Sequence, residues 1–251
     1  MTELVGILNV TPDSFSDGGQ FNKPLKAIAR AKQLLADGAS FIDVGAESTR
    51  PNASTLTPAE EWQRLEPVLT ALIAFYPGKI SLDSYHPETI YKAFKIGPVI
   101  VNDVIGMNNP AIVELVAKLK PTVIISQLPG SDIQAAHRLM PVTSPEQVKT
   151  DLLAKAKLLE SHGLTRAQII LDPGIGFGKT PEVNRLLLGF AELVPDYNVM
   201  IGYSRKRFLG EQRMELAPNL AAARLAIMAG ARYLRVHDVA GHKAALSKLL
   251  A

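Results

Sequence analysis

The feature that most constrains the fold of this chain is a regular alternation between short apolar runs and longer amphipathic stretches. The apolar runs are nearly continuous in hydrophobicity and are bounded by Gly, Pro or polar residues, which is typical of parallel strands covered on both faces. Eight such runs occur in the 251 residues, at Val5–Val10, Phe41–Val44, Lys79–Leu82, Val99–Asn102, Thr122–Ile125, Gln168–Leu171, Val199–Gly202 and Tyr233–Val236.

Helical patterns separate the apolar runs. In Leu25–Leu35, the residues Ile28, Ala31 and Leu34 recur at the spacing of one helical face. Several of these stretches begin with a hydroxyl residue before a proline, and several end at a glycine, as helices commonly do. The other predicted helices are Pro58–Tyr76, Pro87–Lys95, Pro110–Leu119, Pro145–Ser161, Pro181–Leu193, Pro218–Ala229 and Gly241–Leu250.

This order of elements predicts the (β/α)8 barrel, or TIM barrel, an α/β fold of about 250 residues. A doubly wound open sheet produces the same alternation and is the alternative. No linker, low-complexity tract or shift in composition divides the chain, so residues 1–251 are expected to form a single domain.

Composition argues against several classes of protein. The net charge is only +3, aromatic residues make up 6% of the chain, and no basic stripe carries interleaved aromatics, so nucleic acid is the weakest candidate partner. The absence of cysteine excludes disulfides and cysteine-ligated metal sites. No apolar run approaches the ~20 residues of a membrane span, and the first residues lack a basic leader pattern. We therefore expect a soluble, cytoplasmic protein that has no membrane partner.

Polar residues gather at the carboxyl ends of the predicted strands, where barrel enzymes place their active sites. They are Asn9, Asp43, Asp83, Asn102, Asp172, Lys206, Arg235 and His237. Each alone has an ordinary explanation as a helix cap, a turn former or a structural hydrogen-bonding group. Together they would bury carboxylates in one pocket, which is costly unless a ligand or an ion pair compensates them. The set predicts a flat ligand that is rich in N–H donors and carries an anionic group.

Three loops add to this prediction. Thr11–Gly19 and Glu47–Ser54 follow the first two strands and are long enough to act as lids. Asp172–Lys179 is rich in glycine but does not match the GxxxxGK[ST] pattern of phosphate loops. Its glycines instead predict a close approach of the backbone to a planar ligand.

Seven motifs resemble, in order, those of the dihydropteroate synthase family. Gly6–Gly19 reads GILNVTPDSFSDGG and Ile42–Pro51 reads IDVGAESTRP, which are similar to the first and second signatures of that family. The set is completed by Ser81–Ser84, Asn102–Val104, Leu171–Lys179, Ser204–Lys206 and Arg235–Val239.

The resemblance implies a transferase of folate biosynthesis, which condenses 6-hydroxymethyl-7,8-dihydropterin diphosphate with p-aminobenzoate and releases diphosphate. The residues that it implies at the pterin are Asp83, Asn102, Asp172 and Lys206, with Asp43 on the pocket floor. The residues that it implies at the diphosphate are Asn9, Arg235 and His237, with a Mg²⁺ cofactor held by Asn9 and, as a further candidate ligand, Asp13.

The two lid loops match the loops that form the p-aminobenzoate site in this family, and two later residues match its remaining walls. The implied residues are Phe15, Asp17, Ser48, Thr49, Arg50, Pro51, Phe177 and Lys206. Those expected to take part in catalysis are Asp17, Arg50, Lys206, Arg235 and His237. The resemblance also implies a homodimer.

The chain departs from the family pattern after the fifth predicted strand. Ser126–Gly130 reads SQLPG where the family commonly has Met-His-Met-Gln-Gly, and the usual methionine lines the pterin ring. Ala46 and Asn52 also stand where glycine is usual. Two alternatives therefore stay open: a pterin-binding paralogue that has lost activity, and a methyltransferase domain that passes a methyl group from a folate to a corrinoid.

Overall fold

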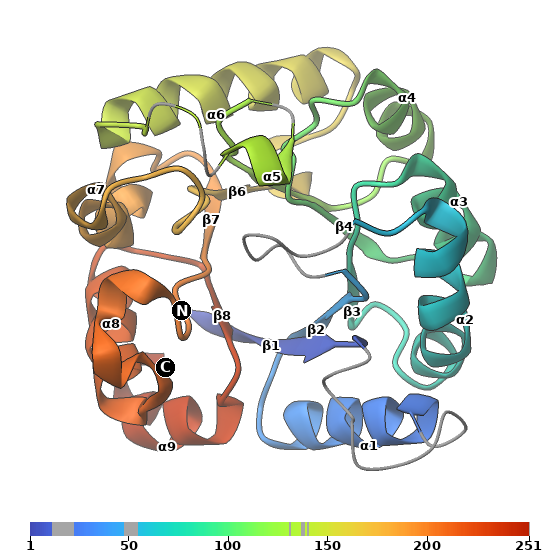
Figure 1. Ribbon diagram of the computed structural model, residues 1–251, viewed down its shortest axis with the longest axis horizontal. Coiled ribbons are helices and arrows are strands. Elements are labelled where there is room, and N and C mark those ends of the chain that lie inside the picture. The colour runs from blue at the N-terminus through green and yellow to red at the C-terminus, as the bar shows by residue number, and fades with distance from the viewer. Residues whose placement is uncertain (12–22, 48–54, 131, 137–138, 140, 251) are drawn as a thin grey trace.

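The computed structural model describes residues 1–11, 23–47, 55–130, 132–136, 139 and 141–250. Within these ranges, eight parallel strands close into a barrel in sequence order, and the helices form a ring around it (Figure 1). The strands are β1 (Glu3–Asn9), β2 (Phe41–Gly45), β3 (Ile80–Asp83), β4 (Ile100–Asp103), β5 (Val123–Ser126), β6 (Ile169–Asp172), β7 (Asn198–Ile201) and β8 (Tyr233–Val236). The predicted TIM barrel is confirmed, and the open sheet is wrong because β1 pairs with both β2 and β8.

Each strand is followed by helical structure. The α-helices are α1 (Lys23–Ala36), α2 (Pro58–Phe75), α3 (Pro87–Ile96), α4 (Pro110–Leu119), α5 (Ile133–Ala136), α6 (Pro145–Ser161), α7 (Pro181–Leu186), α8 (Leu216–Met228) and α9 (Val239–Leu250). Short 3-10 helices cover Arg166–Gln168, Leu187–Leu193, Arg207–Leu209 and Glu211–Met214. Among the helices of the described ranges, none is long and apolar enough to cross a membrane.

The helix starts follow the signals in the sequence. The side chains of Thr57, Ser144 and Thr180 each accept a hydrogen bond from a backbone N–H of the first turn, and a proline follows each of them. The predicted helix Pro181–Leu193 is an α-helix only as far as Leu186 and continues as a 3-10 helix. Gly189 lies in that second part, and glycine disfavours the α-helical interior.

The two-residue period of the strands divides the barrel interior into layers. A lower apolar layer is formed by Val5, Phe41, Ile124, Ile170 and Met200, with Ile100 and Tyr233 packed against it. Two positions further along the same strands, the inward-facing residues are mostly polar: Asp43, Asn102, Ser126, Asp172 and Arg235, together with Gly202. The apolar layer therefore closes the barrel below a polar upper layer.

The alternate strand positions face outward, toward the helices. Leu8, Val44, Leu82, Ile125 and Leu171 belong to the large buried cluster that packs the barrel against its helical ring. The polar side chains of the upper interior are therefore surrounded by apolar residues, which shield them from bulk water. It is the same end of the barrel at which the sequence predicts the site.

Gly174, which follows β6, lies where the backbone is tightly packed at the carboxyl end of the barrel strands. Gly174 has a φ of +64°, and a Cβ added there would lie 2.1 Å from the carbonyl oxygen of Gln127. Gly78 has a similar φ of +74°, but a Cβ there would meet no atom within 4 Å. We expect Gly174→Ala to lower the free energy of unfolding by at least about 3 kcal/mol, because it combines strain with a backbone clash.

Gly78→Ala is the matched control and should cost only about 1 kcal/mol, the strain of a left-handed residue. Urea unfolding followed by circular dichroism measures both. Equal losses in the two variants would show that the close approach at Gly174 carries no energetic weight.

Candidate active site

Asp43 is the centre of a hydrogen-bond network in the upper barrel. Its side chain is fully buried, and it accepts hydrogen bonds from Ser81 Oγ at 2.6 Å, Asn102 Nδ2 at 3.0 Å and Arg235 Nε at 2.6 Å. The donors come from β3, β4 and β8, so one carboxylate joins three other strands. Asp43 thereby fixes the positions of Asn102 and Arg235, which belong to the same polar layer.

Arg235 joins this network to a second carboxylate. Its NH2 group contacts Asp83 Oδ2 at 2.9 Å while its Nε contacts Asp43, and its side chain is only 20% exposed. A guanidinium presents a rigid fork of donors, which suits it to bind two carboxylates in fixed positions. The predicted meeting of Asp43, Asp83 and Arg235 is therefore present in the structure.

The carboxyl group of Asp83 has a raised pKa at this position. Burial and, to a smaller extent, the neighbouring Asp43 charge raise the pKa of the Asp83 carboxyl to about 7, against the opposing effect of Arg235. A group with such a pKa changes its charge near neutral pH, which is common at sites that bind or transform a ligand.

Asn102 presents an acceptor that has no partner. Its amide nitrogen donates to Asp43, but no described residue donates to its buried Oδ1 atom. A buried polar atom without a hydrogen bond costs about 1–3 kcal/mol. Such an atom in the upper barrel fits a ligand that brings its own N–H donor.

Asp172, Lys206 and Arg235 surround a single point above Gly202. A Cβ added at Gly202 would lie 3.5 Å from Asp172 Oδ2, 3.8 Å from Lys206 Nζ and 3.9 Å from Arg235 Cδ. The missing side chain of Gly202 thus leaves space between one carboxylate and two cations. The predicted convergence of these three side chains is present as well.

Lys206 is held by the loop after β6. Its Nζ donates to the carbonyl of Ile175 and lies 5.2 Å from the ring centroid of Phe177. Burial lowers the pKa of Lys206 to about 8, against the opposing effect of Asp172. The ring of Phe177 and the ammonium therefore form one wall of the site.

The loop after β6 is organised by a residue that the sequence prediction missed. Lys179 Nζ donates to three carbonyl oxygens, those of Gln127 at 3.2 Å, Gly174 at 3.0 Å and Phe177 at 3.0 Å. Burial lowers the pKa of Lys179 to about 7. Gly174 was expected to approach a planar ligand, but it packs against the Gln127 backbone and donates to Asp172 Oδ1 at 2.8 Å.

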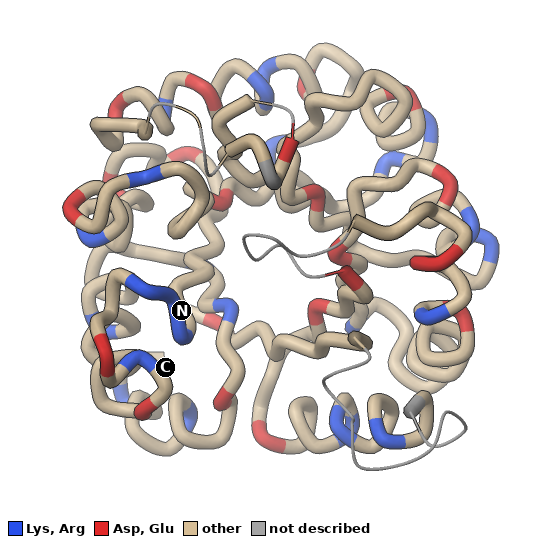
Figure 2. Tube along the Cα trace, viewed as in Figure 1, with Lys and Arg blue, Asp and Glu red and all other residues tan. Residues whose placement is uncertain are grey.

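His237 follows β8 directly and pairs with Ser204, which lies in one of the predicted motifs but had no predicted role of its own. Its Nδ1 lies 2.9 Å from Ser204 Oγ, which also accepts a hydrogen bond from the His237 backbone N–H at 3.3 Å. Asn9 ends β1 at the same end of the barrel and is half-buried. Figure 2 shows charged positions both around the inner ring of strands and on the outer helices.

The remaining predicted residues lie outside the described part of the chain. They are Asp13, Phe15 and Asp17 of the loop after β1, and Ser48, Thr49, Arg50 and Pro51 of the loop after β2. The structure thus describes the predicted pterin and diphosphate residues, with Phe177 and Lys206 from the predicted p-aminobenzoate site.

Comparison with known proteins identifies the family. The family model described as pterin binding enzyme matches residues 5–237. The chain is 36% identical to the dihydropteroate synthase of Escherichia coli over 245 residues, which cover 94% of this chain and 86% of the relative.

Solved structures agree with this relationship. The fold is similar to that of Xanthomonas albilineans dihydropteroate synthase with 4-aminobenzoic acid, with a TM-score of 0.88 at 35% identity, covering 98% of this chain and 91% of the other. A structure of the same enzyme in complex with 7,8-dihydropteroate gives a TM-score of 0.83 at 32% identity, covering 98% and 92%. The chain belongs to the pterin binding enzymes and, among them, to the dihydropteroate synthase family.

Proposed function

We propose that this protein is a dihydropteroate synthase, which joins 6-hydroxymethyl-7,8-dihydropterin diphosphate to p-aminobenzoate and releases diphosphate. The observation that carries the proposal is the set of acceptors above the apolar layer of the barrel. Asp172, Lys206 and Arg235 surround the space above Gly202, and Arg235 also binds Asp83. Asn102, in the same polar layer, has a buried Oδ1 with no partner among the described residues. A pterin ring offers a row of N–H donors beside a carbonyl, which matches acceptors next to a cation.

The pterin edge is assigned to four residues. Asp172 and Asp83 accept N–H donors of the ring, and Asn102 Oδ1 gains its missing partner from the ligand. Lys206 donates to the pterin carbonyl and ring nitrogen. Hydrogen bonds between charged groups and paired donors are shorter and stronger than neutral ones, so these contacts fix the plane of the ring.

The leaving diphosphate is assigned to Arg235, His237 and Asn9. Arg235 already contacts Asp43 through Nε and Asp83 through NH2. It would therefore bind the diphosphate through its NH1 group, or one of the two ion pairs would have to break. The oxygens of Asn9 and Asp13 are the hard donors that Mg²⁺ prefers. A Mg²⁺ ion held there would supply positive charge to the diphosphate as it leaves.

The reaction breaks the bond between the exocyclic methylene carbon and the diphosphate oxygen, and the electron pair leaves with the diphosphate. The aryl amine then bonds to that carbon and loses a proton. Cations at the diphosphate and carboxylates near the pterin stabilise the separated charges of this transition state. The amine is already nucleophilic and needs orientation, for which the residues of the two lid loops, Asp17 and Arg50 among them, are the candidates.

The altered segment after β5 bears on how well the pterin is held. Ser126 is buried at the end of β5, and its register partner on β6 is Asp172. A serine at this position is smaller than the methionine usual in the family, which favours a looser contact with the pterin face. A paralogue that binds pterin without turnover therefore stays the second candidate.

The decisive experiment separates binding from turnover. We expect the protein to bind 6-hydroxymethyl-7,8-dihydropterin diphosphate in calorimetry and to release diphosphate only after p-aminobenzoate is added, as a coupled assay would measure. Asp172→Asn should weaken pterin binding at least about a hundredfold, because it removes a charged acceptor. Asp151→Asn, outside the proposed pocket, is the matched control and should bind normally. Tight binding without diphosphate release would identify the inactive paralogue.

The acidities of Asp83 and Lys206 predict a bell-shaped dependence of pterin affinity on pH. Protonation of Asp83 below its pKa of about 7 removes an acceptor, and loss of the proton from Lys206 above its pKa of about 8 removes a donor. Affinity for 6-hydroxymethylpterin, which lacks the titrating diphosphate, should therefore fall on both sides of the range from pH 7 to 8. Calorimetry from pH 5.5 to pH 9.5 would measure it.

Lys206→Arg tests the assignment of the alkaline limb, since an arginine stays protonated throughout the range from pH 5.5 to pH 9.5. This variant should lose the decline above pH 8 and keep the decline below pH 7. A profile that is flat in the wild type, or an alkaline limb that survives in the variant, would count against these assignments.

A homodimer and a cytoplasmic location complete the proposal. The homodimer is supported by apolar side chains on the outside of α8: Leu225 is 55% exposed and Met228, three residues later on the same face, is 78% exposed. Such a face gains stability by packing against the same face of a second copy around a two-fold axis.

Sedimentation velocity tests the dimer. We expect the wild type to sediment as a dimer and Met228→Glu to weaken self-association at least about tenfold, because it places a charge in an apolar contact. Leu158→Glu on α6 is the matched control, since Leu158 is 41% exposed on a different helix. A wild type that sediments as a monomer would remove this part of the proposal.

A further inference from the structure

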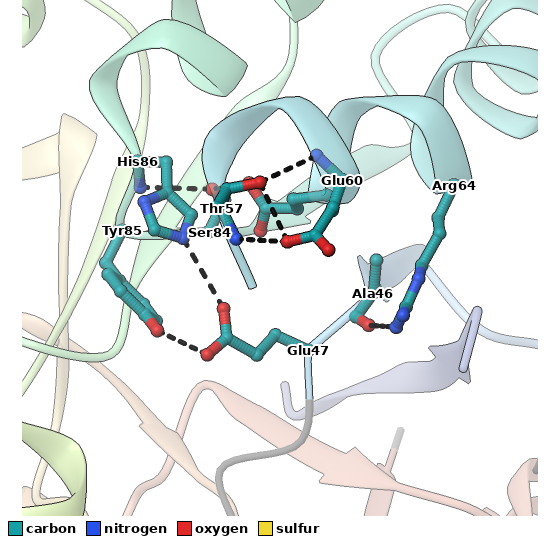
Figure 3. Close-up of polar contacts among 9 residues, drawn as sticks. Ala46, Glu47, Thr57, Glu60, Arg64, Ser84, Tyr85 and His86 are labelled. Carbon is teal, nitrogen blue, oxygen red and sulfur yellow. Dashed lines mark hydrogen bonds and ion pairs between the residues drawn. The ribbon is translucent and has the colours of Figure 1, made fainter. Parts of the chain in front are cut away.

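A second polar cluster lies outside the barrel interior, where the end of β2 meets α2 and the turn between β3 and α3. It consists of Glu47, Glu61 and His86, which are called the Glu–Glu–His cluster below. One side-chain atom from each residue lies within 4.8 Å of the others. Figure 3 shows Glu47 reaching up from the end of β2 toward Tyr85 and His86. The proposed reaction uses none of the three residues.

The cluster is buried, and the atoms that face its centre have few partners. Glu61 is fully buried, and the side chains of Glu47 and His86 are only 7% and 15% exposed. No described residue makes a hydrogen bond to Glu47 Oε2, Glu61 Oε1 or His86 Nε2. Three atoms of metal-ligating types thus meet in one place, away from bulk water, and the closest described partners of Glu47 Oε2 and His86 Nε2 are each other.

The other oxygen of each carboxylate is held in place. Tyr85 donates its hydroxyl to Glu47 Oε1 at 2.5 Å, and Ser84 Oγ donates to Glu61 Oε2 at 2.8 Å. The backbone N–H of His86 donates to Ser84 Oγ at 3.2 Å. Metal sites commonly have such outer donors, which orient the ligands and leave one oxygen of each free to bind.

The charges of the cluster also favour a cation. When both carboxylates are ionised and the imidazole is neutral, the cluster carries two negative charges in a small volume. In the absence of a metal ion, a proton on His86 would balance the charge of Glu47 across their 3.4 Å contact, and burial, which raises the pKa of Glu61, favours a proton on that carboxyl. A divalent ion would balance both.

We propose that Glu47, Glu61 and His86 bind a divalent transition-metal ion, with Zn²⁺ as the best match. Imidazole nitrogen and carboxylate oxygen are common ligands of Zn²⁺, at about 2.0–2.2 Å in a tetrahedral arrangement. Two ligands of such a site lie about 3.3–3.5 Å apart by this geometry, close to the 3.4 Å between Glu47 Oε2 and His86 Nε2. Three protein ligands leave a fourth position for water.

The ion would have a structural role. It would tie the end of β2 to α2 and to the β3–α3 turn, and Glu47 directly precedes residues 48–54. This site is separate from the Mg²⁺ position proposed at Asn9 and Asp13. Its test is therefore independent of whether the protein makes dihydropteroate.

Calorimetry on the full chain after chelator treatment tests the site, with ZnCl2 as the titrant and excess Mg²⁺ present to occupy sites made of hard oxygen donors. We expect one equivalent of Zn²⁺ to bind in the wild type. His86→Gln should weaken the affinity at least about a hundredfold, and Ser84→Ala, which removes an outer donor, about tenfold to a hundredfold. His162→Gln, at an exposed histidine after α6, is the matched control and should bind as the wild type does.

The absence of zinc binding, or an equal affinity in His86→Gln and the wild type, would overturn the proposal. Crystals of the wild type grown with Zn²⁺ keep the test valid if a variant fails to fold. Anomalous density at the zinc absorption edge between the three side chains supports the site. Zinc bound only elsewhere in those crystals refutes it.

Discussion

The upper half of the barrel depends on the ion pairs that Arg235 makes with Asp43 and Asp83. Asp43 is fully buried and Asp83 has a strongly raised pKa, so neither carboxylate would be tolerated well without the guanidinium between them. Removing one partner from a buried pair typically costs about 3–5 kcal/mol, since the other charge is left behind. Asp43 also orients Asn102, whose buried Oδ1 has no partner among the described residues and is the clearest sign of a missing ligand. Stability and binding are thus served by one set of contacts.

The polar layer is possible because the lower barrel is sealed by Val5, Phe41, Ile124, Ile170 and Met200. Gly202 then keeps a space open between Asp172, Lys206 and Arg235. Outside the barrel, the Glu–Glu–His cluster repeats the same physical situation, with buried acceptors that lack donors. In both places, buried polar atoms with incomplete hydrogen bonding are the basis for the proposed ligands.

The fold and much of the site could be predicted because both follow from local rules. A two-residue period places Asp43, Asp172 and Arg235 on the same side of their strands as the apolar layer, so their convergence follows once the barrel is assumed. The role of Lys179 could not be predicted, since its three acceptors are backbone carbonyls brought together only by packing. The Glu–Glu–His cluster could not be predicted for the same reason, because its three residues come from different elements and form no spacing pattern in the sequence. The change of helix type at Leu187 has one signal in the sequence, Gly189, but a single glycine does not fix where an α-helix becomes a 3-10 helix.

The pairing of β1 with β8 has a consequence for how the protein is made. The other strand pairs of the described barrel join strands that are consecutive in the sequence, whereas β1 and β8 come from the two ends of the chain. The hydrogen bond from Thr2 to Ala231, beside this pair, connects residues 229 positions apart. Loop-closure entropy makes such a contact slow to form, so the seam is expected to close late in folding. Since β8 also delivers Arg235, a chain still emerging from the ribosome holds Asp43 and Asp83 without their counter-charge. The pocket therefore comes into being only as the barrel closes, and an incompletely synthesised chain cannot capture substrate.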